Sequence, residues 1–293
     1  MVEKRSLGEK IFNVCNILFM IFVIVVCVYP IVYVILASLS DSNMLMAHEG
    51  LLFKPLGFSF KAYTKILENP MVYIGFKNTL FILIVGVSIN MVLTLIGGYF
   101  LSRQNVMWKT PIMIMVVVTM YFNGGLVPTY LTVKALGLEN SIWSLILPSA
   151  INTFNLIIMR TGFQSIPNEL EEAARIDGAG HITILFRIFT PLIKPTMAVI
   201  LLYYAVGHWN SWFNASIYLT NRALYPIQLV LREILIQNDT TSMTTGIASG
   251  ETEAIAESLR YALIVVTTVP VLCIYPFLQR FFEKGVMVGS VKG

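Results

Sequence analysis

Charged residues are scarce in this chain. Only 12% of the 293 residues are Asp, Glu, Lys or Arg, and the mean hydropathy is +0.75. An average soluble domain is about 25% charged, and a soluble helical protein places charges at short intervals along its wet faces. The sequence therefore excludes an ordinary water-soluble protein and indicates a membrane protein.

Motifs of catalysis are missing too. The three cysteines all lie in apolar runs, which excludes a disulfide framework or a zinc site built from them. No Gly-Lys pair occurs, so the chain has no phosphate-binding loop of the Gly-x-x-x-x-Gly-Lys-Ser/Thr type. His-Glu-x-x-His, Gly-x-Ser-x-Gly and paired intramembrane aspartates are also absent. We therefore expect a protein that is not an enzyme and that holds no metal or cofactor itself.

Long charge-free runs dominate what is present. A helix that crosses a bilayer needs about 20 apolar residues, and lipid-exposed backbone must be helical or closed into a barrel. The run near the N-terminus is too long for a cleaved signal peptide, so we interpret it as a first span. The sequence predicts an all-α polytopic membrane protein with six transmembrane helices, over residues 11–40, 78–102, 110–133, 140–159, 195–221 and 261–279.

The six predicted spans contain no Asp, Glu, Lys or Arg. Ion-coupled secondary transporters usually place ionisable relays within the membrane. His208 is the one titratable candidate of physiological relevance, and a single histidine beside Trp209 is more typical of a hydrogen-bonded structural residue. An ion-coupled transporter is therefore disfavoured, although it stays an alternative.

Lysine and arginine predict the orientation. With the N-terminus in the cytoplasm, the inner segments hold twelve Lys and Arg and the longer outer segments hold eight. The excess of positive charge on the inner side follows the known bias. We expect cytoplasmic tails at 1–10 and 280–293 and extracytoplasmic loops at 41–77 and 222–260, the last with a short helix within 242–257.

The cytoplasmic segment 164–194 differs from a plain connector. Pro167 suits a first helical turn, Ser165 or Asn168 can cap it, and Gly178 supplies a left-handed stop. The short helix that results has one weakly apolar face, made of Leu170, Ala173, Ala174 and Asp177. Two interpretations are open: an interfacial helix that fills a loop, or a docking helix whose Glu172 meets an arginine of a cytoplasmic partner.

The same segment resembles a known family. Glu172-Ala173-Ala174, then Gly178, then Ile188-Phe-Thr-Pro191 is similar to the EAA motif of permeases in binding-protein-dependent ABC importers, with Thr190 where the family pattern has leucine. The surrounding residues resemble the carbohydrate branch, the maltose-type second permease. The segments 121–130, 209–212 and 285–293 resemble its lipoprotein-associated subgroup, linked with complex oligosaccharides.

The resemblance implies a type I (MetI-like) ABC importer permease that carries an oligosaccharide through the bacterial cytoplasmic (inner) membrane, with a permease core at 78–279. It implies three partners: a homologous permease subunit, an ATPase dimer that binds ATP and Mg²⁺, and an extracytoplasmic solute-binding protein. A permease for a non-sugar solute is the alternative. The residues that the resemblance assigns to ATPase coupling are Glu169, Glu172, Ala173, Ala174, Asp177, Gly178 and Pro191.

Amides and aromatic residues in the spans are candidates for the substrate pathway. Sugar hydroxyls match amide groups, and sugar ring faces match aromatic faces. Amides also join helices within membranes, and tryptophan favours membrane interfaces. Gly86, Thr94, Gly97 and Gly98 are expected to permit close helix contact instead. The pathway candidates are Asn123, Asn152, Phe154, Asn155, Tyr203, Tyr204, Trp209, Asn210 and Trp212.

Overall fold

The computed structural model describes residues 7–104, 106–236 and 257–274. The expected short helix within 242–257 and the tail 280–293 therefore lie outside the described residues, apart from Glu257. Within the described part the chain is helical, and its β-type pairing is a single bridge between Ser40 and Phe58. The chain divides into two units, Met1–Asn69 with Glu233–Thr268, and Pro70–Arg232 with Val269–Gly293.

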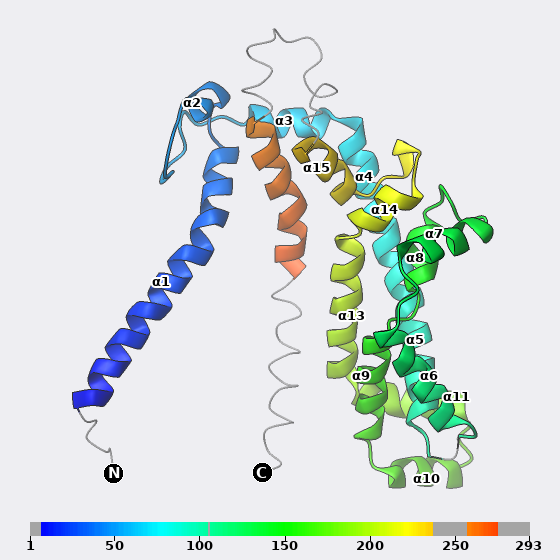
Figure 1. Cartoon of the computed structure of the whole chain (residues 1–293). Helices are drawn as coiled ribbons and strands as arrows, with labels where there is room; N and C mark the ends of the chain where they lie inside the picture. Colours follow the sequence, from blue (N-terminus) through cyan, green and yellow to red (C-terminus); the bar gives the residue numbers. More distant parts are fainter. Residues whose placement is uncertain (1–6, 105, 237–256, 275–293) are drawn as a thin grey trace. The chain divides into compact units, whose positions relative to one another are not determined.

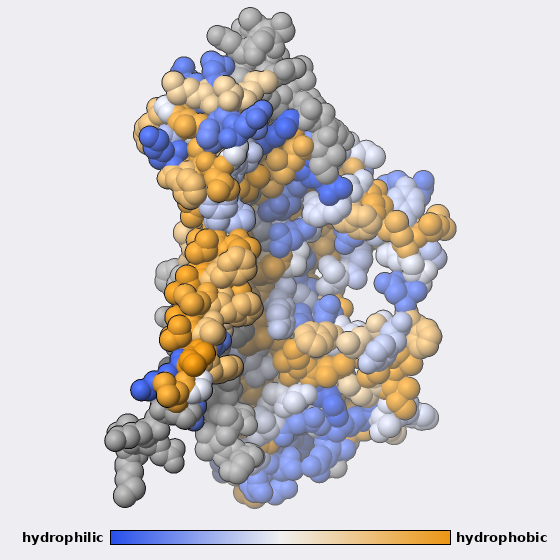
Figure 2. Space-filling view, turned by 60° about the vertical axis from the view of Figure 1, so that its left-hand side comes forward, coloured by the Kyte–Doolittle hydropathy of each residue, from blue (hydrophilic) through white to orange (hydrophobic). Residues whose placement is uncertain are grey.

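The first unit contains the long helix α1 (Leu7–Ser38), followed by α2 (Ser42–Met46) and α3 (Lys61–Glu68). The apolar side chains of α1 are exposed over nearly its whole length, and Figure 2 shows its hydrophobic surface. Within a bilayer such a surface faces lipid or another apolar helix. The small core of this unit lies at the C-terminal end of α1 and includes Ala37 and Leu52.

The second unit carries α4 to α14, the short helices between them and the first part of α15, whose residues 233–236 belong to the first unit (Figure 1). A continuous helix of 33 residues opens it, in which α4 (Pro70–Phe81) and α5 (Val87–Ser102) flank the π-helical turn η1 (Ile82–Gly86). The helices that follow are α6 (Lys109–Tyr121), α7 (Leu126–Ala135), α8 (Trp143–Ile146), η2 (Leu147–Ser149), α9 (Thr153–Gln164), α10 (Asn168–Ile176), α11 (His181–Thr183), η3 (Ile184–Phe189), α12 (Thr190–Leu192), α13 (Lys194–Trp209), α14 (Trp212–Tyr218), η4 (Arg222–Leu224) and α15 (Ile227–Ile236).

Close packing of α5 against α9 and α13 forms the centre of this unit. A Cβ at Gly98 would lie 2.6 Å from Met159 Cγ on α9, and one at Gly86 would lie 2.8 Å from His208 Nε2 on α13. Thr94 on α5 shares a hydrogen bond of 2.7 Å with the hydroxyl of Tyr204 on α13. The prediction that the small residues of this span permit close helix contact is confirmed.

Three helices in the described part are long and apolar enough to cross a membrane: Leu7–Ser38, Pro70–Ser102 and Glu257–Ile274. Two bent pairs raise the number to five if each is one span. Lys109–Tyr121 meets Leu126–Ala135 at 116°, and His181–Leu192 meets Lys194–Trp209 at 87°.

The expectation that each charge-free run is one continuous helix is therefore wrong for three runs. The run 110–133 breaks at Gly125, whose φ of +90° is left-handed, and the run 195–221 breaks after Trp209. The run 140–159 breaks around Pro148, which has no N–H to donate. The second span also begins earlier than predicted, because the helix starts at Pro70 and includes Lys77.

Candidate functional site

Helix α10 forms the exposed centre of the EAA-like segment. Its N-cap residue is Pro167, and neither predicted capping side chain caps it; the Ser165 hydroxyl instead donates to the carbonyl of Gly162 at the end of α9. Its C-terminal end is as predicted. Gly178 has a φ of +81°, and the amide of Ala179 donates to the carbonyl of Ala174 at 2.9 Å.

The predicted docking face of α10 is divided between protein and solvent. Ala174 is buried against the unit, whereas Glu172, Ala173 and Asp177 are exposed. Successive residues of a helix point about 100° apart, so two neighbouring alanines do not face the same way. The expectation that Ala174 shares the outer face is wrong.

The other predicted coupling residues lie on or near this helix. Glu169, in the first turn of α10, and Gly178, directly after its end, are both exposed. Pro191 lies apart from α10, in α12, before the bend that leads into α13.

Sequence reasoning missed the contact that holds α10 in place. Glu171, whose side chain is 14% exposed, forms an ion pair with Arg103, the residue directly after α5, and a second one with Arg175 at 2.7 Å. Burial by itself would raise the pKa of the Glu171 carboxyl, but the hydrogen bonds and charges of the two arginines outweigh burial and lower the pKa. The one hint in the sequence is that Arg103 is the first charge after a long apolar run.

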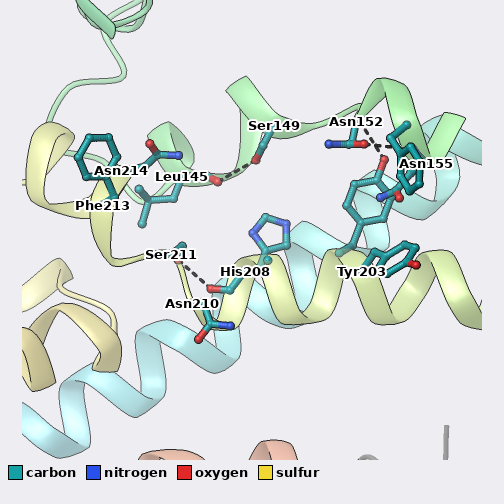
Figure 3. A pocket seen from close by; sticks show the side chains of 13 residues that line it. Leu145, Ser149, Asn152, Asn155, Tyr203, His208, Asn210, Ser211, Phe213 and Asn214 are labelled. Atoms are coloured by element: carbon teal, nitrogen blue, oxygen red, sulfur yellow. Dashed lines mark hydrogen bonds between the residues drawn. The ribbon is translucent and has the colours of Figure 1, made fainter. Parts of the chain in front are cut away.

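A cavity of about 560 Å³ lies beside α9 and α13 (Figure 3). Its boundary depends on the break before α9. The side chain of Asn152 caps α9 by accepting from the amide of Asn155 at 3.1 Å. The backbone amide of Asn152 donates to the hydroxyl of Tyr204 at 3.0 Å, which ties this break to α13.

Among the described residues, those that line the cavity include no carboxylate, lysine or arginine. Amides, hydroxyls and a histidine alternate with aromatic rings, and the rings of Phe154 and Tyr203 lie 6.1 Å apart. The residues that line it are Leu145, Ser149, Asn152, Phe154, Asn155, Tyr203, Tyr204, Gly207, His208, Asn210, Ser211, Phe213 and Asn214.

Two thirds of the predicted pathway residues line this cavity: Asn152, Phe154, Asn155, Tyr203, Tyr204 and Asn210. Three do not. Asn123 accepts from the amide of Gly125 in the bend before α7, Trp209 is buried near Phe76, and the ring of Trp212 lies 3.6 Å from the guanidinium carbon of Arg232.

Helix geometry explains which of the predicted residues in and directly after α13 line the cavity. Tyr203, Gly207 and Asn210 are spaced at three and four residues and share one face, whereas Trp209 points elsewhere. The lining residues that sequence reasoning did not propose for the pathway include Ser149 at the end of η2, Ser211 in the break after α13 and Phe213 in the short helix α14.

Comparisons with known proteins identify a family and several relatives. Residues 2–288 match the family model of the binding-protein-dependent transport system inner membrane component. The chain is 40% identical over 290 residues to the polygalacturonan/rhamnogalacturonan transport system permease protein YtcP of Bacillus subtilis (strain 168), covering 97% of this chain and 99% of that protein. It is 40% identical over 284 residues to protein LplC of the same organism, covering 97% and 96%.

A solved structure is similar over nearly the whole chain. It comes from a bacterial ABC transporter involved in the import of the acidic polysaccharide alginate. The TM-score is 0.88 at 28% identity, and the match covers 96% of this chain and 100% of that one. Together with the family match, this shows that the chain belongs to the family of inner membrane components of binding-protein-dependent transport systems.

Proposed function

We propose that this chain is one permease subunit of an ATP-driven importer that carries an oligosaccharide across the bacterial cytoplasmic membrane, and that α10 couples it to a separate ATPase. The observation that carries the proposal is the arrangement of one helix. The N-terminal end of α9 borders the cavity, which is lined by amides, hydroxyls and aromatic rings, and its C-terminal end leads through residues 165–167 into the exposed helix α10.

The chemistry of the cavity supports a sugar. Amides and hydroxyls exchange hydrogen bonds with sugar hydroxyls in the way that water does, and the rings of Phe154 and Tyr203 offer apolar faces to sugar rings. The names of YtcP and of the alginate transporter also refer to polysaccharides. In this proposal, a second, homologous permease subunit also contributes to the selectivity for the size and identity of the solute.

The surface of α10 supports docking of an ATPase. Glu172 and Ala173 are both exposed, so α10 offers a carboxylate to a partner and, about 100° further around the helix, a methyl group that lets a partner approach closely. The chain has no phosphate-binding loop, so in this proposal ATP and Mg²⁺ bind to an ATPase dimer. The proposal also places both termini and α10 in the cytoplasm, and an extracytoplasmic binding protein delivers the solute on the other side.

The experiment is transport in proteoliposomes that contain this chain, its partner permease, the ATPase and the binding protein. Labelled oligosaccharides are added outside and ATP is enclosed. We expect uptake that requires hydrolysable ATP. Uptake that persists without ATP and collapses with an ion gradient would indicate a secondary transporter. ATP-dependent uptake of a different class of solute would overturn the sugar assignment alone.

Reversing the charge at Glu172 tests the coupling surface. We expect Glu172→Lys to lower uptake by about tenfold or more, because loss of a charge-assisted contact at a partner surface costs about 1.4 kcal/mol or more. The measurement is the initial rate of ATP-driven uptake at equal protein. The control is Glu68→Lys, which makes the same reversal at an exposed glutamate outside α10. Unchanged uptake in Glu172→Lys contradicts the assignment of this surface.

A further inference from the structure

Arg103 is a buried arginine in direct contact with several elements of the second unit. Its side chain is 9% exposed, and it donates from Nε to the Ser102 hydroxyl at 3.0 Å and from Nη2 to the carbonyl of Phe163 at 3.2 Å. Its guanidinium carbon lies 5.3 Å from the ring centre of Tyr99 and 4.7 Å from that of Phe189. Arg103 therefore contacts the end of α5, the end of α9 and the π-helical turn η3 at once.

The remaining terminal nitrogen of Arg103 donates to Glu171 of α10. Glu171 points inward, whereas Glu169 and Glu172 on either side of it are exposed. The other oxygen of the Glu171 carboxylate accepts from Nη2 of Arg175, which is half exposed. The carboxylate thus joins α10 to the body of the unit and closes an i,i+4 pair on α10 itself.

Apolar contacts also hold the α10 segment, because Ile166 before the helix and Ala174 within it are buried in the core of the unit and Ala179 after the helix packs against that core. Ala174 is the one residue of this helix that is buried. A single methyl group removes only a small apolar area from water and defines no direction. The ion pair is directional, because a guanidinium presents its donors in a rigid plane. The pair of Arg103 and Glu171 therefore adds a directional contact between α10 and the unit.

A buried ion pair is a poor device for stability alone, since a well-packed apolar pair of the same volume is often as stabilising or more so. Its position in this chain suggests a different use. Helix α9 borders the cavity at Asn152 and Asn155, and eight residues beyond Asn155 it offers the carbonyl of Phe163 to Arg103. One arginine thus connects α10 to the helix that borders the cavity.

We propose that Arg103 and Glu171 are positioning residues that make α10 and the packed ends of α5, α9 and η3 move as one body, so that a displacement of α10 reaches the cavity. The inference rests on the proposed docking of an ATPase at α10. The two adjacent carboxylates then have separate tasks. Glu172 faces the partner subunit, and Glu171 faces the bundle to which the movement is transmitted.

Without this link, a displacement of α10 by the ATPase rotates α10 about its two flanking connections, residues 165–167 and 177–180. Helices α5 and α9 then stay in place. ATP hydrolysis continues while transport falls. Substitution of a residue that merely stabilises the fold lowers ATP hydrolysis and transport together, in proportion to the loss of assembled transporter. The ratio of solute transported to ATP hydrolysed therefore distinguishes a positioning residue from a stabilising one.

The test uses the complete transporter in proteoliposomes, with Glu171→Gln, Arg103→Gln and the double variant. We expect each single variant to assemble and to lower the solute transported per ATP by about five- to tenfold, within the usual range for coupling between distant sites. The double variant should be no worse than the single ones, because both changes break one link. The control is Lys134→Gln, which removes one positive charge from an exposed ion pair with Glu139 in the same unit.

If Arg103→Gln fails to assemble, a second variant at the same position still tests the inference. Arg103→Lys keeps the positive charge next to Glu171 but cannot reach the Phe163 carbonyl with a second nitrogen. We expect its ratio of transport to hydrolysis to fall as well, and a wild-type ratio overturns the inference.

Other outcomes also decide the question. A defect in Glu171→Gln with wild-type behaviour of both Arg103 variants would show that Glu171 contacts the ATPase directly, against the inference. Unchanged ratios in all variants overturn the inference and leave the proposed function intact, provided that the wild-type protein shows ATP-driven uptake. Absence of such uptake in the wild-type protein refutes both.

Discussion

Asn90 is a buried polar side chain that satisfies several partners inside the helical unit. Asn90 on α5 donates to the carbonyls of Ser149 and Ala150 at 2.8 and 2.9 Å, and its oxygen accepts from Nε2 of His208 at 2.6 Å. The buried amide thereby joins α5, the break before α9 and α13. The prediction that His208 is hydrogen-bonded is confirmed by this contact, and its ring also borders the cavity.

The lowered pKa of Glu171 leads to a prediction about pH. A carboxyl whose pKa in the folded protein lies below its ordinary value of 4.5 contributes stability that is present above that value and is lost as the pH falls towards the folded pKa. We expect the purified protein to be more stable than Glu171→Gln by about 1–3 kcal/mol, the usual worth of hydrogen bonds to a charged group. That difference should stay constant from about pH 8 to pH 6 and shrink below about pH 4.5.

The measurement is the melting temperature of both proteins in detergent across this pH range. Arg187→Gln, which removes an exposed arginine of the same segment, is the control for a general loss of charge. A difference that vanishes already near pH 6 would mean that the pKa of Glu171 is raised and not lowered.

At the scale of elements, glycines determine how closely the helices pack. Gly98 faces Met159 on α9 so tightly that an added Cβ would lie within 3.0 Å of two side-chain carbons, at 2.6 and 2.9 Å, and 3.2 Å from the backbone nitrogen of Arg160. A Cβ added to Gly207 on α13, in contrast, would have no heavy atom within 4 Å, leaving aside its chain neighbours and its own helix backbone. Two helical glycines of the same unit are therefore subject to opposite constraints.

We predict that Gly98→Ala lowers the free energy of unfolding by about 1–3 kcal/mol, because overpacking forces α5 and α9 apart. Gly207→Ala should leave stability unchanged or raise it by about 0.5–1 kcal/mol, since alanine favours a helix over glycine. The measurement is thermal unfolding of both variants in the same detergent. Equal effects of the two substitutions would contradict the packing of α5 on α9 described above.

The sequence predicted the C-terminal end of α10 correctly but its N-terminal cap wrongly, and the difference has a physical reason. Gly178 stops α10 as expected, because a left-handed position favours glycine wherever it occurs in a chain. The capping of α10 by Ser165 or Asn168 was wrong, because Ser165 already ends α9 and bonds back to it. Whether a serine ends one helix or begins the next depends on how the two helices are connected, which the local sequence leaves open.

At the scale of the unit Pro70–Arg232, the cavity collects side chains from residues 145–214, and several of them lie in breaks between helices. The aromatic pair Phe154 and Tyr203 comes from two different helices, α9 and α13. Its rings add aromatic surface to a lining that also contains amides and hydroxyls. We therefore expect these rings to contribute to the affinity for a sugar.

We predict that Tyr203→Ala raises the apparent KM for oligosaccharide uptake by about two- to tenfold, the equivalent of about 0.5–1.5 kcal/mol for an aromatic contact. The coupling ratio of solute to ATP should stay as in the wild-type protein, because Tyr203 is remote from α10 in the chain. The measurement is uptake against solute concentration. Tyr121→Ala, at an exposed tyrosine that does not line the cavity, is the control, and an equal rise in KM there would argue against a specific contact.

The sequence by itself determined the class of this protein. Charge-free runs predict membrane helices because the cost of placing charge in lipid depends only on local composition, and the EAA-like pattern predicts the family because its residues are neighbours in the chain. The tertiary structure alone decided the bends in three of those runs, the inward turn of Ala174 and the pairing of Arg103 with Glu171. These features join residues that are up to 68 positions apart, and contacts of that kind depend on how helices pack, which no local pattern records.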